Sequence, residues 1–120
     1  VRDTYGLAFK ETRSMDPTLM YSALVAGEVE AISAFTTDGR LDSFDLVVLE
    51  DPAGAIPPYD AFILVGPTIA NRPDVIGVLD KLVGTIDVAK MRNANLMVDR
   101  EQDKKTPAQA AGWLWEQPRH

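Results

Sequence analysis

The sequence contains no cysteine, and its only histidine is His120, the last residue. Without cysteine, the chain can form no disulfide and no zinc site built on thiolates. A single histidine at a chain end is typical of a tail or tag, so no internal imidazole is available for acid–base catalysis. The sequence therefore predicts no metal site and no cofactor.

Positive charge is also scarce. Twelve Lys and Arg residues stand against 18 Asp and Glu residues, which gives a formal net charge of −6. The longest basic run is Lys104–Lys105. Nucleic-acid binding depends on clustered cations that neutralise phosphates, so this balance disfavours a nucleic-acid partner.

Long apolar runs are missing as well. No window reaches the roughly 18 apolar residues that a membrane span needs, so we predict no membrane insertion. A signal peptide has a charged start followed by an apolar stretch, and this sequence contains no such pattern. The chain begins with Val1 rather than Met, and a processed product, an excised domain and a natural short protein all remain alternatives at this point. Its 120 residues, 46% of them hydrophobic, are typical of one globular domain.

The usual catalytic patterns do not occur. Carboxylates are frequent between residues 42 and 60, but no spacing places two of them on one face as an acid and a base. The glycines are scattered, without a Walker loop, a dinucleotide fingerprint or a nucleophile elbow. We predict no catalytic residues and no enzyme activity.

Helix signals are clear in what remains. Asp16–Pro17 is typical of a helix start and Gly27 of a helix end, so we expect a helix over residues 17–26. The same kind of signal predicts later helices that begin at Pro73, after Asp87 and at Thr106–Pro107.

Strand-like segments alternate with these helices. Their apolar residues alternate or run without interruption, as in the strands of covered sheets. The four predicted strands are residues 5–9, 28–35, 44–49 and 59–65. The predicted fold class is therefore α/β, with a mixed sheet flanked by helices.

The most specific pattern lies between Phe35 and Phe62. The segment FTTDGR, residues 35–40, begins at the last residue of one predicted strand. Glu50–Asp51 follow the next strand, and PPYD lies at residues 57–60. This order resembles the ligand-binding proteins of ABC importers for quaternary-amine osmoprotectants, such as glycine betaine and choline. The resemblance runs from about Tyr5 to Trp115. The family's proteins are more than twice as long, and this chain resembles their C-terminal portion.

This resemblance implies part of a two-lobed, type II periplasmic-binding-protein-like fold. Residues 1–50 would be part of the second lobe, residues 51–58 a crossover or hinge, and residues 59–120 the C-terminal part of the first lobe. The resemblance also implies an extracytoplasmic location and an ABC permease as partner.

The resemblance further implies a ligand-binding site. In this family, Tyr side chains from two lobes surround a trimethylammonium group, and Phe35 and Tyr59 match two such positions. A quaternary cation donates no hydrogen bonds, so aromatic faces hold it. Both residues also have a structural explanation, Tyr59 as the anchor of a strand start and Phe35 as a core residue. Thr37 and Asp38 are candidate ligand-binding residues, or they only build a turn with Gly39.

An alternative function follows from the short length. A partial two-lobed fold exposes strand edges and apolar faces that must be covered. The alternative is a truncated, stand-alone interaction module that forms a homodimer, for example by domain swapping, and has lost the transport role. A complementary fragment is another possible partner.

Overall fold

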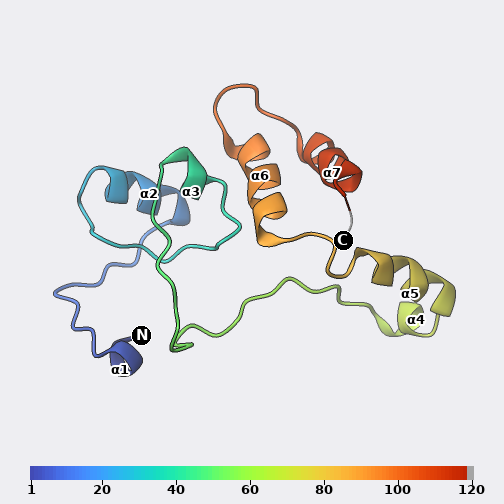
Figure 1. Cartoon of the computed structure of the whole chain (residues 1–120), viewed down its shortest axis with the longest axis horizontal. Helices are drawn as coiled ribbons and strands as arrows, with labels where there is room; N and C mark the ends of the chain where they lie inside the picture. Colours follow the sequence, from blue (N-terminus) through green and yellow to red (C-terminus); the bar gives the residue numbers. More distant parts are fainter. Residues whose placement is uncertain (119–120) are drawn as a thin grey trace.

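The computed structural model describes residues 1–118, so His120, expected to belong to a tail, lies outside the described residues. Short helices and long connections make up the described chain (Figure 1). In order, the helices are α1 (Arg2–Tyr5), α2 (Pro17–Val25), α3 (Arg40–Ser43), α4 (Pro67–Ala70), α5 (Pro73–Leu79), the 3-10 turn η1 (Asp80–Leu82), α6 (Val88–Asp99) and α7 (Pro107–Glu116).

Local capping explains where the longer helices begin. The Asp16 carboxylate accepts a hydrogen bond from the Thr18 N–H at 2.8 Å at the start of α2. The Asp87 carboxylate accepts one from the Lys90 N–H, also at 2.8 Å, at the start of α6. Each cap satisfies a backbone donor that the first helical turn leaves without a partner.

The last helix has a reciprocal cap. The Thr106 hydroxyl accepts from the Gln109 N–H, and the Gln109 side chain accepts from the Thr106 N–H. The helices predicted from Pro17, Pro73, Asp87 and Thr106 are thus confirmed, and Gly27, with a positive φ of 73°, follows the end of α2.

The predicted fold class is wrong for the described chain. No β-strand occurs within residues 1–118, so the structure contains neither the mixed sheet nor an α/β architecture. Of the predicted strand 5–9, Tyr5 ends α1 and the rest is irregular; segments 28–35, 44–49 and 59–65 are also irregular or extended. A strand is stable only when neighbouring strands accept and donate its backbone hydrogen bonds. Within residues 1–118, no neighbouring segment pairs with these four segments to form a sheet.

The chain is open in shape. Its radius of gyration is 18.0 Å, whereas a compact domain of this length has a radius of about 14 Å. Its accessible surface is 9822 Å², against about 6,400 Å² for a compact protein of this mass. The buried apolar residues of the described part are few: Tyr21, Ala23, Leu41, Ala94 and Ala110.

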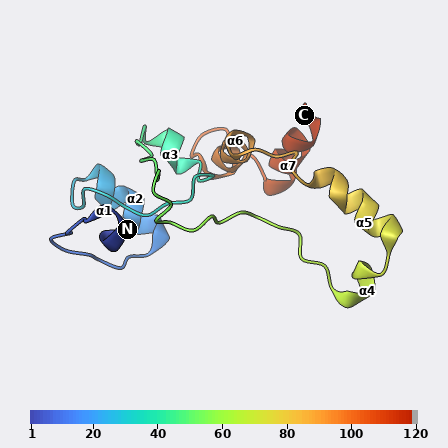
Figure 2. The ribbon, with the colours of Figure 1, turned by 60° about the horizontal axis from the view of Figure 1, so that its bottom comes forward.

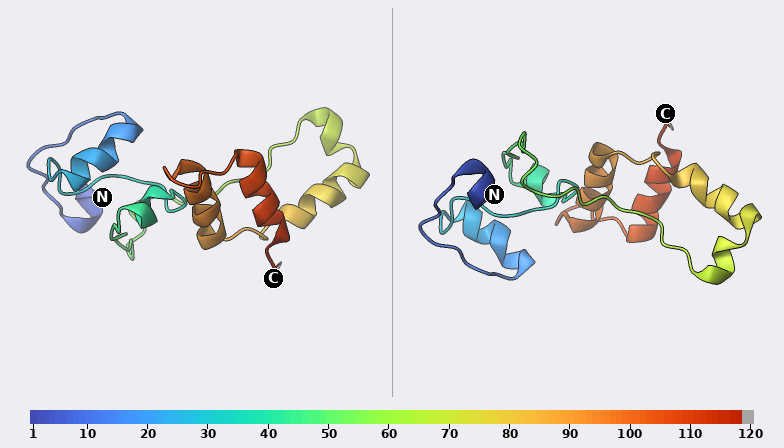
Figure 3. Two further views of the ribbon diagram at one scale, coloured as in Figure 1. Left: turned by 90° about the horizontal axis from the view of Figure 1, so that it is seen from above. Right: turned by 90° about the horizontal axis from the view of Figure 1, so that it is seen from below.

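The helices form three groups along the molecule. Figures 1 and 3 place α1, α2 and α3 at one end, α6 and α7 in the middle, and α4 and α5 at the other end. Helices α6 and α7 pack against each other, and α3 contacts α6. Figure 2 shows the long stretch before α4 running from the first group to the last as an extended connection. This arrangement leaves both segments 44–49 and 59–65 without a packing layer.

Candidate functional site

The structure brings Phe35 and Tyr59 together. Their ring centroids lie 5.3 Å apart, and the ring planes are tilted by 39°. Phe35 is 61% exposed and Tyr59 is 85% exposed. The distance and tilt lie within the range of favourable aromatic pairs. The two candidate residues therefore form an aromatic pair with π faces open to solvent.

The segment that leads to Tyr59 is organised around Asp51. The Asp51 carboxylate accepts hydrogen bonds from the Tyr5 hydroxyl, from the Ala55 N–H at 2.9 Å and from the Ile56 N–H at 2.7 Å. The hydrogen bond from Tyr5, followed by those from the backbone of Ile56 and Ala55, lowers the pKa of Asp51. Two prolines then restrict the backbone immediately before Tyr59.

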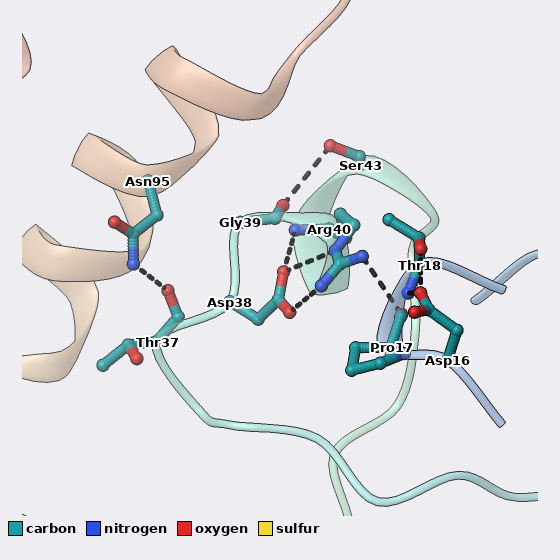
Figure 4. A network of polar contacts seen from close by, with 9 residues as sticks. All are labelled: Asp16, Pro17, Thr18, Thr37, Asp38, Gly39, Arg40, Ser43 and Asn95. Carbon is teal, nitrogen blue, oxygen red and sulfur yellow. Dashed lines mark hydrogen bonds and ion pairs between the residues drawn. The ribbon is translucent and has the colours of Figure 1, made fainter. Parts of the chain in front are cut away.

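Asp38 does not lie free beside the aromatic pair. Its carboxylate accepts two bonds from the Arg40 guanidinium, at 2.7 and 3.0 Å, and a third from the Arg40 backbone N–H at 3.0 Å (Figure 4). These bonds, with the Arg40 side chain as the first cause, lower the pKa of Asp38. In this arrangement the carboxylate shapes the loop from residue 35 to residue 40.

Arg40 connects this loop to α2. Its guanidinium donates to the Pro17 carbonyl at 3.2 Å and lies 4.1 Å from the ring centroid of Tyr21. The Tyr21 hydroxyl is buried and has no hydrogen-bond partner in the described part of the chain. Burial, and then the nearby Asp38 carboxylate, raises the pKa of Tyr21 to about 12. The carboxylate is close enough to influence the hydroxyl, although their geometry falls short of a hydrogen bond.

Thr37 is held through its backbone. Its carbonyl accepts a hydrogen bond from Asn95 Nδ2 of α6 at 2.8 Å, and the neighbouring Thr36 carbonyl accepts one from Arg92 Nε at 2.7 Å. Sequence reasoning missed Asn95 and Arg92, because these contacts join residues 58 and 56 positions apart. No local sequence signal indicates such a contact.

The surface hollows lie elsewhere. They are wide open to solvent and lie beside the 12–16 loop and α2, with Arg13, Met15 and Met20 among their lining residues. Among residues 1–118, no three acidic or histidine side chains gather as a metal-binding cluster. No helix in the same range is long and apolar enough to span a membrane. The aromatic pair is thus the feature that fits the predicted ligand chemistry.

Comparison with known proteins identifies the class. Residues 1–117 match the family described as the substrate-binding domain of the ABC-type glycine betaine transport system. The chain belongs to this family, as its motifs between Phe35 and Phe62 predicted. The family's domains bind substrates for transporters and are not enzymes.

Three relatives illustrate the similarity. The chain is 37% identical over 112 residues to a glycine-betaine-binding protein of Pseudomonas aeruginosa. It is 31% identical over 96 residues to the carnitine transport binding protein OpuCC of Listeria monocytogenes. It is 33% identical over 104 residues to the ergothioneine transport permease/ergothioneine binding protein EgtU of Helicobacter pylori.

These relatives are much longer than the region they share with this chain. The matches cover 91%, 79% and 86% of this chain, but 35%, 31% and 18% of the respective relatives. The chain therefore spans about a third or less of each of these proteins.

Proposed function

We propose that this chain is part of a substrate-binding domain that holds a quaternary-ammonium osmolyte, such as glycine betaine or choline, for ABC-type import. Phe35 and Tyr59 are the two walls that it contributes to an aromatic cage. The contact between their exposed rings, 5.3 Å apart, is the observation that carries the proposal. The substrates named for the relatives, glycine betaine, carnitine and ergothioneine, all contain a trimethylammonium group, which agrees with this chemistry.

Two rings alone bind weakly. An exposed cation–π contact contributes about 0.5–1 kcal/mol per ring, so two rings contribute about 1–2 kcal/mol. A dissociation constant of about 1 mM already requires about 4 kcal/mol. Further walls must therefore come from outside this aromatic pair, and the greater length of the relatives is consistent with such walls.

The proposed mechanism is closure of two lobes around the cation. Residues 1–50 carry Phe35, residues 59–120 begin with Tyr59, and residues 51–58 form the crossover between them. Closure would remove water from around the paired rings, which strengthens cation–π attraction. Thr37 and Asp38 support the loop that carries Phe35. The loaded domain would deliver its ligand to an ABC permease outside the cytoplasm.

A titration with tetramethylammonium tests the cage. This ion carries the recognised group and nothing else, and 3,3-dimethylbutan-1-ol is an uncharged match for the choline shape. We expect tetramethylammonium, at constant ionic strength, to shift the NMR signals of the Phe35 and Tyr59 rings, and the alcohol to shift them much less. Tyr59→Ala should abolish the shifts at Phe35. Phe62→Ala removes another exposed ring, three residues further along the chain, and should preserve them.

Equal shifts with the cation and the alcohol would contradict cation–π recognition. Persistence of the Phe35 shifts in Tyr59→Ala would show that the pair is not the binding unit.

A second candidate function is supported by the exposed surface. The described chain exposes about 3,400 Å² more than a compact protein of the same mass. Obligate homodimers bury about 2,000–5,000 Å² in total, or about 1,000–2,500 Å² per copy, so a second copy would cover about a third to three quarters of this excess. The alternative is therefore a homodimeric interaction module without a transport role, and its molar mass as a function of concentration tests it.

A further inference from the structure

We propose that Asn95 and Arg92 of α6 are positioning residues for the aromatic pair, because they clamp the backbone of the loop that carries Phe35. This inference rests on the proposed cage and adds two residues that neither the motif nor the ring contact indicates. They touch no ligand, and they act through the orientation of Phe35.

The clamp holds the two residues that directly follow Phe35. Arg92 Nε donates to the Thr36 carbonyl at 2.7 Å, and Asn95 Nδ2 donates to the Thr37 carbonyl at 2.8 Å. The Asn95 contact is partly buried and is drawn in Figure 4. Because both acceptors are backbone carbonyls, the clamp fixes the path of the chain and does not depend on the Thr side chains.

The loop transmits this restraint to Phe35. The Asp38 N–H donates to the Phe35 carbonyl at 3.0 Å and closes a turn around Thr36 and Thr37. The Asp38–Arg40 ion pair then stiffens the far side of that turn. A displacement of the clamped carbonyls therefore moves Phe35 relative to Tyr59.

A close backbone approach locks the loop onto α6. Gly39 is buried against Leu96, and a Cβ atom at position 39 would lie 2.4 Å from the Leu96 backbone nitrogen and 2.5 Å from its Cα. Backbone atoms cannot move aside as a flexible side chain can. Arg92 extends the contact by pairing with Asp42 of α3 at 3.3 Å. Glycine at position 39 is thus required for the clamp to form.

The clamp joins the two proposed lobes. The loop belongs to residues 1–50, whereas α6 belongs to residues 59–120, which also supply Tyr59. Docking of α6 onto the loop therefore links the two proposed lobes directly beside Phe35, the residue that contacts Tyr59. Ligand affinity should then depend on Asn95 and Arg92, although neither contacts the cation.

Asn95→Ala tests the proposal, with Asn93→Ala as the matched control on an exposed position of the same helix. The first readout is the nuclear Overhauser effect between the Phe35 and Tyr59 rings, which needs no ligand. The second is the tetramethylammonium titration. We expect Asn95→Ala to lose the ring contact and to weaken binding about fivefold, the equivalent of one hydrogen bond. Asn93→Ala should match the unmodified chain in both readouts.

Gly39→Ala disrupts the clamp from the loop side, because its Cβ would collide with the Leu96 backbone. It should separate the Phe35 and Tyr59 rings, as Asn95→Ala does. Circular dichroism should show that helix content is kept in all three variants. If Asn95→Ala unfolds α6, Gly39→Ala still tests the proposal, since it leaves the helix sequence intact. An unchanged ring contact in Gly39→Ala or in a folded Asn95→Ala would overturn the clamp. The cage itself fails separately if tetramethylammonium shifts no ring signal in the unmodified chain, whatever the clamp variants do.

Discussion

At the residue scale, the best-defined interaction is the ion pair between Asp38 and Arg40. The Asp38 side chain is 13% exposed and the Arg40 side chain 29%, so the pair is shielded from solvent better than the other ion pairs of the described chain. Its guanidinium also reaches the Pro17 carbonyl and the face of Tyr21. One side chain thus connects the loop that carries Phe35 to α2.

This pair predicts a pH dependence of stability. The Arg40 side chain lowers the pKa of Asp38 in the folded chain. The stabilisation is therefore complete above the ordinary Asp pKa of about 4 and is lost as the pH falls through the lower folded value. We expect Asp38→Asn to lower the free energy of unfolding by about 2 kcal/mol at pH 7, with a smaller difference from the unmodified chain near pH 2. Urea unfolding across this range measures both values.

Asp45→Asn is the control for a general charge effect, because Asp45 is exposed and carries no ion pair in the described chain. The same loss of stability in both variants, at every pH, would contradict a specific role for Asp38.

At the element scale, the helices follow local rules. Asp16, Asp87 and Thr106 each cap the helix that the sequence predicts, because a cap needs only residues two or three positions away. The strands are different. Segments 44–49 and 59–65 have strand-like sequences, yet each would need a remote partner, and no such partner lies beside them in residues 1–118.

The cap of α7 gives a prediction at this scale. Thr106→Ala removes the hydroxyl that accepts from the Gln109 N–H and leaves that donor without its partner. We expect the helix content to fall and the free energy of unfolding to drop by about 1 kcal/mol. Thr106→Ser keeps the hydroxyl and should behave as the unmodified chain. Circular dichroism with urea checks this, and equal stability of the Ala and Ser variants would rule out an energetic role for the cap.

At the scale of the whole molecule, the exposed apolar segments dominate. Leu64 is 86% exposed and Val47 is 85% exposed, in a chain with a radius of gyration of 18.0 Å. Extended apolar segments with free backbone groups favour association with other chains. The second candidate function depends on whether two copies cover these segments.

Leu64→Lys tests association through this surface. Burying the Lys charge in an apolar contact would cost free energy, because the charge would lose its water. The variant should therefore remain monomeric at concentrations where the unmodified chain associates. Size-exclusion chromatography with light scattering, over a range of protein concentrations, measures the molar mass. Gln102→Lys adds the same charge on an exposed loop and should not change association. A monomer at every concentration for the unmodified chain would exclude the homodimer.

The family and the two candidate aromatic residues were predictable from sequence. The order of FTTDGR and PPYD identified the family and selected Phe35 and Tyr59, because motif residues keep their spacing along the chain. The environment of Asp38 and the role of Gly39 were not predictable in detail. Both depend on neighbours, Tyr21 and Leu96, that folding brings from other helices.

The sequence by itself therefore determined the helix starts, the class of binding protein and the two aromatic candidates. Only the tertiary structure decided that the two rings meet, that α6 clamps the loop beside Phe35, and that the strand-like segments form no sheet within residues 1–118. The physical reason is the range of the interactions. Caps and motifs act over a few residues, whereas ring contacts, clamps and β-ladders need partners that lie far away along the chain.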